Sequence, residues 1–325
     1  MFQDRSSEIV EALQRKEAYD EPVRYIKTIE THISTVFLTG TYAYKVKKPV
    51  KFNFLDYSSL AKRKMFCLKE VEINSHLSPD LYMGVVPIRK GKTIAIGGKG
   101  RAMEYAVKMH EIPQRYMMSR LLKKKKVDDR HIRKIAEKIV SFHRSYGATE
   151  EAEKYGGYAW VAKNCMDNFS DTQHLEGKVI PHSVFQKTQE KTLLFLEKNR
   201  ALFEERVREG RIRATHGDLH SGNIFISDKI YIFDAVEFNP EIYCTDVAAE
   251  VAFLCMDLDL YDRRLSRLFA EAYVSLSYDR RLLSLLTFYK CYRAMVRVKI
   301  NGFSTKTHAL AQKYSNLAAE YAGEF

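Results

Sequence analysis

Three oxygen-bearing side chains with a defined spacing lie in residues 215–234, which read THGDLHSGNIFISDKIYIFD. Asn223 follows Asp218 by five positions, and Asp234 follows Asn223 by eleven. Between Asn223 and Asp234, two β-rich runs flank a polar turn, a pattern that predicts a hairpin. A hairpin would bring these two residues to one end of paired strands, where an amide oxygen and a carboxylate suit Mg²⁺. Asp218 precedes them in a predicted loop and is free to face a substrate hydroxyl.

The D-x-x-x-x-N spacing of Asp218 and Asn223 is that of the protein-kinase catalytic loop, where Asp takes the hydroxyl proton and Asn holds a metal. The sequence departs from protein kinases, with His-Gly-Asp for His-Arg-Asp and Phe-Asp-Ala for Asp-Phe-Gly. The HGDLHSGN loop followed by IFD resembles instead the aminoglycoside phosphotransferase and choline kinase branch of kinase-like enzymes. A turn cap explains any one Asp or Asn more simply, but the whole constellation favours the kinase-like interpretation. His216, Gly217 and His220 are then expected to shape the loop.

Lys45 and Lys47 lie two positions apart on a predicted strand, so both side chains point to one face. The order Ala-Tyr-Lys ending at Lys45 resembles the Ala-x-Lys that places a lysine on the α- and β-phosphates. This register favours Lys45 and leaves Lys47 open, the simpler alternative being two solvent-facing lysines. Residues 25–38, the turn Thr-Gly-Thr at 39–41 and the lysine strand predict a strand–turn–strand in the place of a nucleotide-covering hairpin.

A helix predicted over about residues 59–77 offers Glu70 and Glu72 as partners for the lysine. Glu70 has the register in which related phosphotransferases carry their helix glutamate. The next predicted strands end at Glu111-Ile112-Pro113, where the lobes of a kinase hinge. The resemblance therefore implies that backbone groups of Met109 to Glu111 lie near adenine.

Composition and charge bound the remaining possibilities. Among 325 residues, 46% are hydrophobic and 29% charged, as in ordinary soluble proteins. No apolar run approaches a membrane span and the first residues lack a signal-peptide core, so we expect no membrane association. Five scattered cysteines without C-x-x-C favour reduced thiols in a cytoplasmic protein over disulfides or zinc. The net charge of +12 invites a nucleic-acid partner, but the dense basic run 123–126 lacks interleaved aromatics. We therefore do not expect such a partner and interpret the run as a solvated turn, with attraction of anionic substrates such as ATP as a second, milder use of the charge.

The second half of the chain is predicted to be mostly helical. Asp246 is placed to cap a helix over residues 247–258 and to tie it to the catalytic loop. A later helix, over about residues 280–300, carries Arg293 and Arg297 four positions apart and hence on one face. An anionic acceptor is one hypothesis for this pair, and a solvated or internally paired basic face is the other.

Longer stretches sharpen the resemblance. ETHISTVFLTGTYAYKVKKPVKFNFLDYSSL, RATHGDLHSGNIF and IFDAVEFNP look like a prokaryotic group of aminoglycoside-phosphotransferase-like proteins, over about residues 25–300. Members of that group are often fused to a P-loop kinase domain, whose G-x-x-x-x-G-K-[ST] spacing is absent from this sequence. The resemblance implies an α+β, bilobal protein-kinase-like fold. It has a small β-rich nucleotide-binding lobe over residues 1–110 and a larger helical lobe for catalysis and acceptor binding over residues 111–325.

Together these features predict an ATP- and Mg²⁺-dependent phosphotransferase that moves the γ-phosphoryl group to a hydroxyl of a small molecule. Asp218 would orient and deprotonate the acceptor, Asn223 and Asp234 would hold the metal, and Lys45, steadied by Glu70, would hold phosphates. Two alternatives stay open: a catalytically silent nucleotide-binding module that regulates a partner, and a kinase acting on a protein or nucleic acid. The intact Asp–Asn–Asp set argues against the first, and the missing glycine-rich loop and Asp-Phe-Gly argue against the second.

Overall fold

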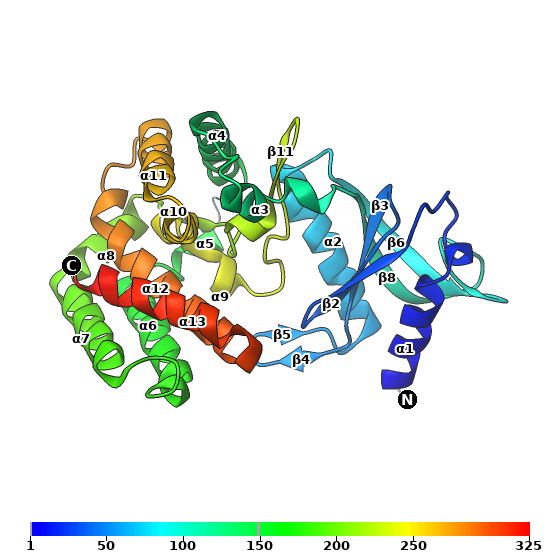
Figure 1. Ribbon diagram of the computed structural model, residues 1–325, viewed down its shortest axis with the longest axis horizontal. Coiled ribbons are helices and arrows are strands. Elements are labelled where there is room, and N and C mark those ends of the chain that lie inside the picture. Colours follow the sequence, from blue (N-terminus) through cyan, green and yellow to red (C-terminus); the bar gives the residue numbers. More distant parts are fainter. Residues whose placement is uncertain (1, 148–149) are drawn as a thin grey trace. The chain divides into compact units, whose positions relative to one another are not determined.

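The computed structural model describes residues 2–147 and 150–325, which form two compact units (Figure 1). The first unit is β-rich and the second is largely helical, so the predicted α+β class is confirmed. The first contains the chain up to Tyr116 together with Tyr231–Asn239; the second contains Met117–Ile230 and Pro240–Phe325. The short segment Tyr231–Asn239 thus belongs with the first unit, whereas the division into lobes at residue 110 assigned it to the second.

The first unit is built on a six-stranded antiparallel sheet with the order β1-β2-β3-β8-β6-β7. Its strands are β1 (Lys27–Glu30), β2 (Ser34–Leu38), β3 (Tyr42–Lys47), β6 (Tyr82–Lys90), β7 (Ile94–Ile96) and β8 (Arg101–His110). Helix α2 (Leu60–Leu77) packs against β8 and β6, and α1 (Phe2–Leu13) packs against β7 (Figure 1). Two further strands, β4 (Lys51–Phe52) and β5 (Leu55–Asp56), form a separate hairpin.

Alternation along β3 sends its side chains into two different apolar clusters. Tyr44 packs into the cluster that includes α1, and Ala43 packs on the other face with Cys67 of α2. Residues two apart in a strand share a face, so Lys45 and Lys47 lie on the α2 side with Ala43. The pattern of β3 therefore directs both lysines toward the helix that carries Glu70.

The predicted continuous strand over residues 25–38 is wrong, because the chain turns at Thr31–Ser34 and divides it into β1 and β2. Thr31 Oγ1 accepts a hydrogen bond from Ser34 N at 2.9 Å and donates one to the Ser34 carbonyl at 3.0 Å. Threonine side chains that bond to nearby backbone in this way favour turns over strand continuation. Ser34 pairs with Lys47, so this turn lies at the lysine end of the sheet. The turn predicted at residues 39–41 joins β2 to β3 and lies at the opposite end of the same two strands.

The second unit consists of helices with short strands set between them. The helices are α3 (Met118–Lys123), α4 (Asp129–Ser145), α5 (Glu150–Glu153), α6 (Tyr158–Thr172), α7 (His182–Lys198), α8 (Arg200–Arg208), α9 (Pro240–Tyr243), α10 (Val247–Asp259), α11 (Arg263–Ser277), α12 (Leu282–Gly302) and α13 (His308–Ala322). Strand β9 (Ile212–Ala214) pairs antiparallel with β12 (Cys244–Asp246). The strand–turn–strand predicted after Asn223 is present as β10 (Ile224–Ile226), which belongs to this unit, and β11 (Ile230–Ile232), of which Tyr231 and Ile232 belong to the first unit. Within the described residues, none of the helices combines the length and apolar character that a membrane span requires.

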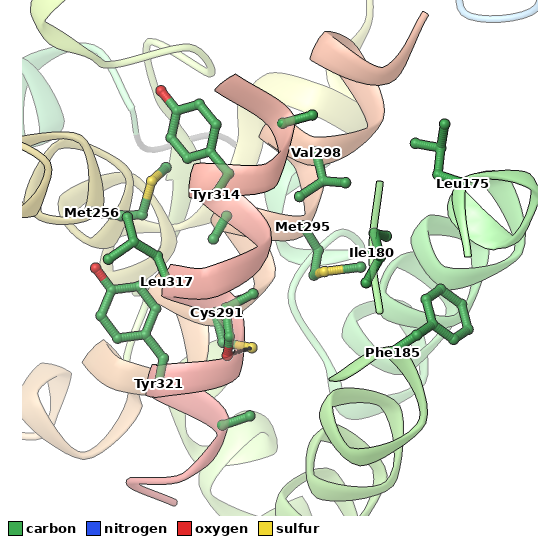
Figure 2. Close-up of a cluster of buried hydrophobic side chains, with 14 of the residues drawn as sticks. Leu175, Ile180, Phe185, Met256, Cys291, Met295, Val298, Tyr314, Leu317 and Tyr321 are labelled. Atoms are coloured by element: carbon green, nitrogen blue, oxygen red, sulfur yellow. Dashed lines mark hydrogen bonds between the residues drawn. The ribbon is translucent and has the colours of Figure 1, made fainter. Parts of the chain in front are cut away.

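Helix α10 lies at the centre of the second unit. Every residue from Val247 to Leu258 is buried, and the helix packs against α11 and α12 (Figure 1). A large apolar cluster joins α10, α12, α13 and the start of α7, and Figure 2 shows Met256, Cys291, Met295 and Leu317 within it. This packing fixes α10, which bonds to the loop between β9 and β10.

A buried guanidinium fixes the N-terminus of α10. Asp246 is the N-cap, as the sequence predicts, and accepts a hydrogen bond from Ala248 N at 2.8 Å. Its carboxylate also takes two bonds from Arg206, at 2.8 and 2.6 Å, and Arg206 reaches Asp279 at 2.6 Å. Arg206 is fully buried, a position that a charge tolerates only when its partners neutralise it. The three residues thereby join α8, β12 and the turn before α12.

Candidate active site

The loop between β9 and β10 brings Asp218, His220 and Asn223 together. Asn223 Nδ2 donates hydrogen bonds to the Asp218 carbonyl at 3.0 Å and to its carboxylate at 3.2 Å. His220 Nε2 lies 3.3 Å from the same carboxylate. The Asp218 side chain is 36% exposed, so it remains open to a ligand on its free side. The spacing seen in the sequence thus corresponds to a real cluster of side chains.

The hydrogen bond at Nδ1 of His220 determines which ring nitrogen carries the proton. Nδ1 accepts a hydrogen bond from Gly222 N at 3.0 Å, so Nε2 carries the proton that faces Asp218. Burial by itself lowers the pKa of His220, but the Asp218 charge outweighs it and raises this pKa. His220 therefore acts as a hydrogen-bond donor that orients the carboxylate.

The pKa of Asp218 lies well below its ordinary value. Burial alone would raise it, but His220, Arg297 and His216 together stabilise the charged form. Asp218 is therefore ionised across the physiological range and is a ready hydrogen-bond acceptor. A carboxylate with so low a pKa is a weak base, so it is better suited to orienting a hydroxyl than to removing its proton early.

Helix α10 holds the backbone of this loop at two points. Glu250 is fully buried and accepts a hydrogen bond from Gly217 N at 2.8 Å. Its carboxylate also lies 2.7 Å from His143 Nε2. Asp257 accepts one from Ser221 N at 2.8 Å. Gly217 has φ +81°, in the left-handed region that favours glycine, which explains the residue type at this position. The predicted loop-shaping role of Gly217 thus has a backbone cause.

In the first unit, Glu70 lies between the two lysines. It is fully buried, and its two oxygens bind Lys45 Nζ at 2.8 Å and Lys47 Nζ at 2.5 Å. Although burial favours the neutral acid, the two lysines hold the pKa of Glu70 at about 2. Glu72, the other candidate, is exposed on α2. Of the two glutamates offered by the helix, Glu70 is therefore the one that pairs with the lysines.

The lysines differ in their second partners. Lys45 forms an ion pair with Asp234, whose side chain is 46% exposed. Lys47 is only 1% exposed and binds Glu237 at 2.6 Å, and Tyr57 Oη donates to that same carboxylate. Lys45 thus faces a solvent-accessible carboxylate, whereas Lys47 is enclosed by protein.

Asp234 adopts an unusual backbone conformation, with φ +66°. Non-glycine residues rarely take this conformation, and where they do, the surroundings must enforce it. Here Asp234 N donates to Tyr82 Oη at 3.1 Å, and Ala235 N donates to Asn74 Oδ1 at 3.0 Å. Ile232 N is held by Ser78 Oγ at 2.9 Å. Tyr82 of β6, helix α2 and the C-cap of α2 therefore hold the backbone around Asp234 in this conformation.

The predicted hinge residues are held by the sheet and by the Gly40 turn. Met109 is buried in β8, and Glu111 N donates to the Thr41 carbonyl at 2.9 Å. The Glu111 carboxylate accepts hydrogen bonds from Gly40 N at 2.7 Å and from Tyr25 Oη. The carboxylate of Glu111 is thus used to fasten the β2–β3 turn to the end of β8.

Comparison with known proteins identifies the fold. No protein-family profile matches the chain. It is 30% identical over 283 residues to uncharacterised proteins of Mycobacterium tuberculosis and Mycobacterium bovis, which is 86% of this chain and 55% of theirs. The chain therefore spans about half the length of these relatives.

Similarity to solved structures extends over nearly the whole chain. The GDP complex of aminoglycoside 2'-phosphotransferase-IIIa aligns with a TM-score of 0.57 at 9% identity, covering 100% of this chain and 99% of that one. A choline/ethanolamine kinase family protein from Mesorhizobium loti aligns with a TM-score of 0.52 at 11% identity, over 100% and 93% of the two chains. The chain has the aminoglycoside-phosphotransferase-like fold. A third structure with this fold, APH(4)-Ia with AMP-PNP and hygromycin B, has a TM-score of 0.50 at 12% identity, over 92% and 94%.

For an aminoglycoside-phosphotransferase-like fold, the oxygen atoms available to Mg²⁺ are the relevant test of the predicted metal ligands. Asn223 uses its amide nitrogen on Asp218, which leaves its amide oxygen as a ligand atom. Asp234 offers a half-exposed carboxylate. Among the described residues, no three His, Cys, Asp or Glu side chains are grouped to hold a metal. Mg²⁺ is usually bound through one or two carboxylates and completes its shell with phosphates and water, so each of the two side chains, taken by itself, offers an oxygen of a suitable kind.

Several residues of these two clusters, one in each unit, were not assigned a role from the sequence. Glu237 and Tyr57 complete the shell of Lys47, and Glu250 with His143 anchors Gly217. Glu250 was visible only as a charged residue in an apolar helix, which is a signal of a buried ion pair. Nothing local in the sequence distinguishes Glu237 from a surface glutamate.

Proposed function

We propose that this protein is a phosphotransferase that transfers the γ-phosphoryl group of ATP to a hydroxyl of a small molecule. The observation that carries the proposal is the cluster in the β9–β10 loop: an ionised, partly exposed Asp218 that Asn223 and His220 hold by hydrogen bonds. The nucleotides in the complexes of similar fold, GDP and AMP-PNP, support a nucleotide as the donor.

Asp218 is the residue that we assign to the acceptor. Phosphoryl transfer passes through a loose transition state, so positioning contributes more than early proton removal. An ionised carboxylate accepts the hydrogen bond of the acceptor hydroxyl, aligns its oxygen with the phosphorus atom and takes the proton as the new P–O bond forms. The low pKa of Asp218 suits this order of events, because the proton moves late.

Lys45 is the residue that we assign to the donor phosphates. Its charge is secured by Glu70, and its second partner, Asp234, is exposed enough to exchange Lys45 for a ligand. We assign one oxygen of Asn223 and one of Asp234 to Mg²⁺, which when bound neutralises charge on the β- and γ-phosphates. Lys47 is assigned a structural role because protein groups enclose it.

The test compares Asp218→Asn with the matched control Asp228→Asn, an exposed aspartate in the turn that follows β10. Acceptor-dependent ADP release is measured with pooled hydroxylated metabolites, and Mg-ATP affinity is measured by calorimetry. Because an amide cannot take the proton, Asp218→Asn should lower transfer by roughly 10²–10⁴-fold and leave nucleotide affinity near that of the parent. The control should behave as the parent.

Other outcomes separate the alternatives. A silent nucleotide-binding module would bind Mg-ATP and release no ADP with any acceptor in either protein. A kinase for macromolecules would phosphorylate a protein or nucleic acid and none of the pooled metabolites. Equal transfer rates for Asp218→Asn and the parent would remove Asp218 from the mechanism.

A further inference from the structure

Helix α12 carries one guanidinium, that of Arg297, close enough to Asp218 for their charges to interact. Of its basic side chains, Lys290 forms an ion pair with Asp259 at 2.6 Å, and Lys299 forms one with Asp171. Arg293 is buried and donates from Nε to the Ala249 carbonyl at 3.2 Å. These three are occupied by the fold, so the basic face proposed from the sequence reduces to Arg297.

One donor atom of Arg297 is unpaired among the described residues. Its guanidinium lies over the Tyr314 ring, 5.5 Å from the centroid, and the Tyr314 hydroxyl is its side-chain hydrogen-bond partner. Its Nε is buried and has no hydrogen-bond partner in the described part of the chain. It forms no ion pair among the described residues, although it is close enough to the Asp218 and Asp257 carboxylates to interact with their charges. A guanidinium that served only to neutralise these carboxylates would be expected to bond to one of them.

The two carboxylates that interact with the charge of Arg297 already have other hydrogen-bond donors. Asp257 is engaged by Ser221 N, and the carboxylate of Asp218 is engaged on one side by His220 and Asn223. The remaining side of the Asp218 carboxylate, which is 36% exposed, and the incompletely bonded Arg297 guanidinium therefore lie close enough within the second unit for their charges to interact. The planar fork of an arginine matches a carboxylate or a phosphate, each of which can accept two parallel hydrogen bonds.

We propose that Arg297 binds an anionic group, a carboxylate or a phosphate, of the same small molecule whose hydroxyl is held by Asp218. The acceptor class is then a hydroxylated acid or a phosphate ester with a free hydroxyl. This inference rests on the proposed function, since it assigns the substrate class of that site. Arg297 would select the acceptor, and Asp218 would orient the hydroxyl that reacts.

The experiment compares the full chain with Arg297→Gln, Arg297→Lys and the charge-matched control Lys299→Gln. Four pools of hydroxylated compounds serve as acceptors with Mg-ATP: carboxylic acids, phosphate esters, neutral polyols and amino alcohols. The parent should phosphorylate members of an anionic pool, and the two anionic pools show whether the group is a carboxylate or a phosphate. Arg297→Gln should raise KM for that acceptor by roughly 10–100-fold, the contribution of a charged hydrogen-bonded pair, and leave KM for Mg-ATP unchanged. Lys299→Gln should leave both constants unchanged, and Arg297→Lys should recover part of the loss because it keeps the charge without the fork.

A preference of the parent for neutral or cationic acceptors would overturn the proposal. A fall in kcat with unchanged KM in Arg297→Gln would also overturn it, because Arg297 would then be a positioning residue for Asp218. A second readout is independent of turnover: the shift of the unfolding temperature produced by glycerate or glycerol phosphate, with glycerol as the uncharged reference. We expect a shift with an anionic probe in the parent that is absent in Arg297→Gln, and no such shift in the parent contradicts the anion site. If the parent shows this shift but releases no ADP with any pool, the proposed function fails while the anion site stands.

Discussion

Replacement of Lys47 by methionine should destabilise the protein far more than the same replacement of Lys45. The two lysines share Glu70, but Lys47 has a side-chain exposure of 1% and its second partner, Glu237, one of 4%. Without Lys47, the Glu237 carboxylate would stay buried, and among the described residues it would keep only the Tyr57 hydroxyl as a partner. Removing one member of a buried ion pair costs about 3–5 kcal/mol, because the charge left behind is not solvated.

Lys45→Met leaves a different situation. Glu70 keeps its bond to Lys47, and Asp234, at 46% exposure, is solvated by water when its lysine is removed. The expected cost is about 1 kcal/mol or less, as for partly exposed ion pairs. Nucleotide affinity should nevertheless fall at least about tenfold in Lys45→Met, because the lost group is the one assigned to the phosphates.

The assay is thermal unfolding by calorimetry of the parent and both variants, with Mg-ATP binding measured well below the transition. At about 2–4 °C per kcal/mol, Lys47→Met should lower the unfolding temperature by roughly 6–20 °C. Adding Glu237→Gln to Lys47→Met should recover much of the loss, since the uncompensated charge is removed. Equal unfolding temperatures for Lys47→Met and Lys45→Met would refute this reasoning.

Three further outcomes can be stated from the same contacts. Asp234→Ala should abolish Mg²⁺-dependent nucleotide turnover, and a metal titration of ADP release at the parent level would exclude Asp234 as a ligand. Glu70 and Glu250 have pKa values of about 2, so their stabilisation is complete above the ordinary glutamate pKa and is lost as pH falls toward about 2. Unfolding temperatures measured from about pH 6 to about pH 3 should fall in the acid range, and less steeply in Glu250→Gln. Gly156→Ala should destabilise the second unit by about 1–3 kcal/mol, because the added Cβ would lie 2.1 Å from Ile212; denaturant unfolding checks this.

Local patterns in the sequence predicted the parts of the site that depend on local geometry. The two-residue period of β3 places Lys45 and Lys47 on one face, and the helical register of α2 brings Glu70 to them. The D-x-x-x-x-N spacing corresponds to the bond between Asn223 and Asp218. Each of these relations spans a few residues or one regular element, so it can be predicted from a local sequence pattern.

The missed features depend on contacts between distant segments or on a single side-chain bond. Glu237 meets Lys47 across 190 positions of sequence, so no local pattern separates Lys47 from Lys45. The β1–β2 turn was missed because threonine is common in strands, so Thr31 was read as part of one. Its hydroxyl instead closes a turn by bonding to the backbone of Ser34. The placement of Tyr231–Asn239 with the first unit likewise follows from its bonds to α2, such as that between Ala235 and Asn74.

The spacing of Glu250 and Asp257 on α10 sets the distance between the two points at which the loop carrying Asp218 is anchored. Seven residues are close to two helical turns, so the two carboxylates lie on one face about 10.5 Å apart along the axis. They receive Gly217 N and Ser221 N, which bracket Asp218. One residue inserted or deleted between them would rotate one anchor by about 100° and release one end of the loop. Among relatives of this chain, the length of this helical interval should therefore vary less than its side chains do, and a change in its length would mark proteins that have lost the loop geometry.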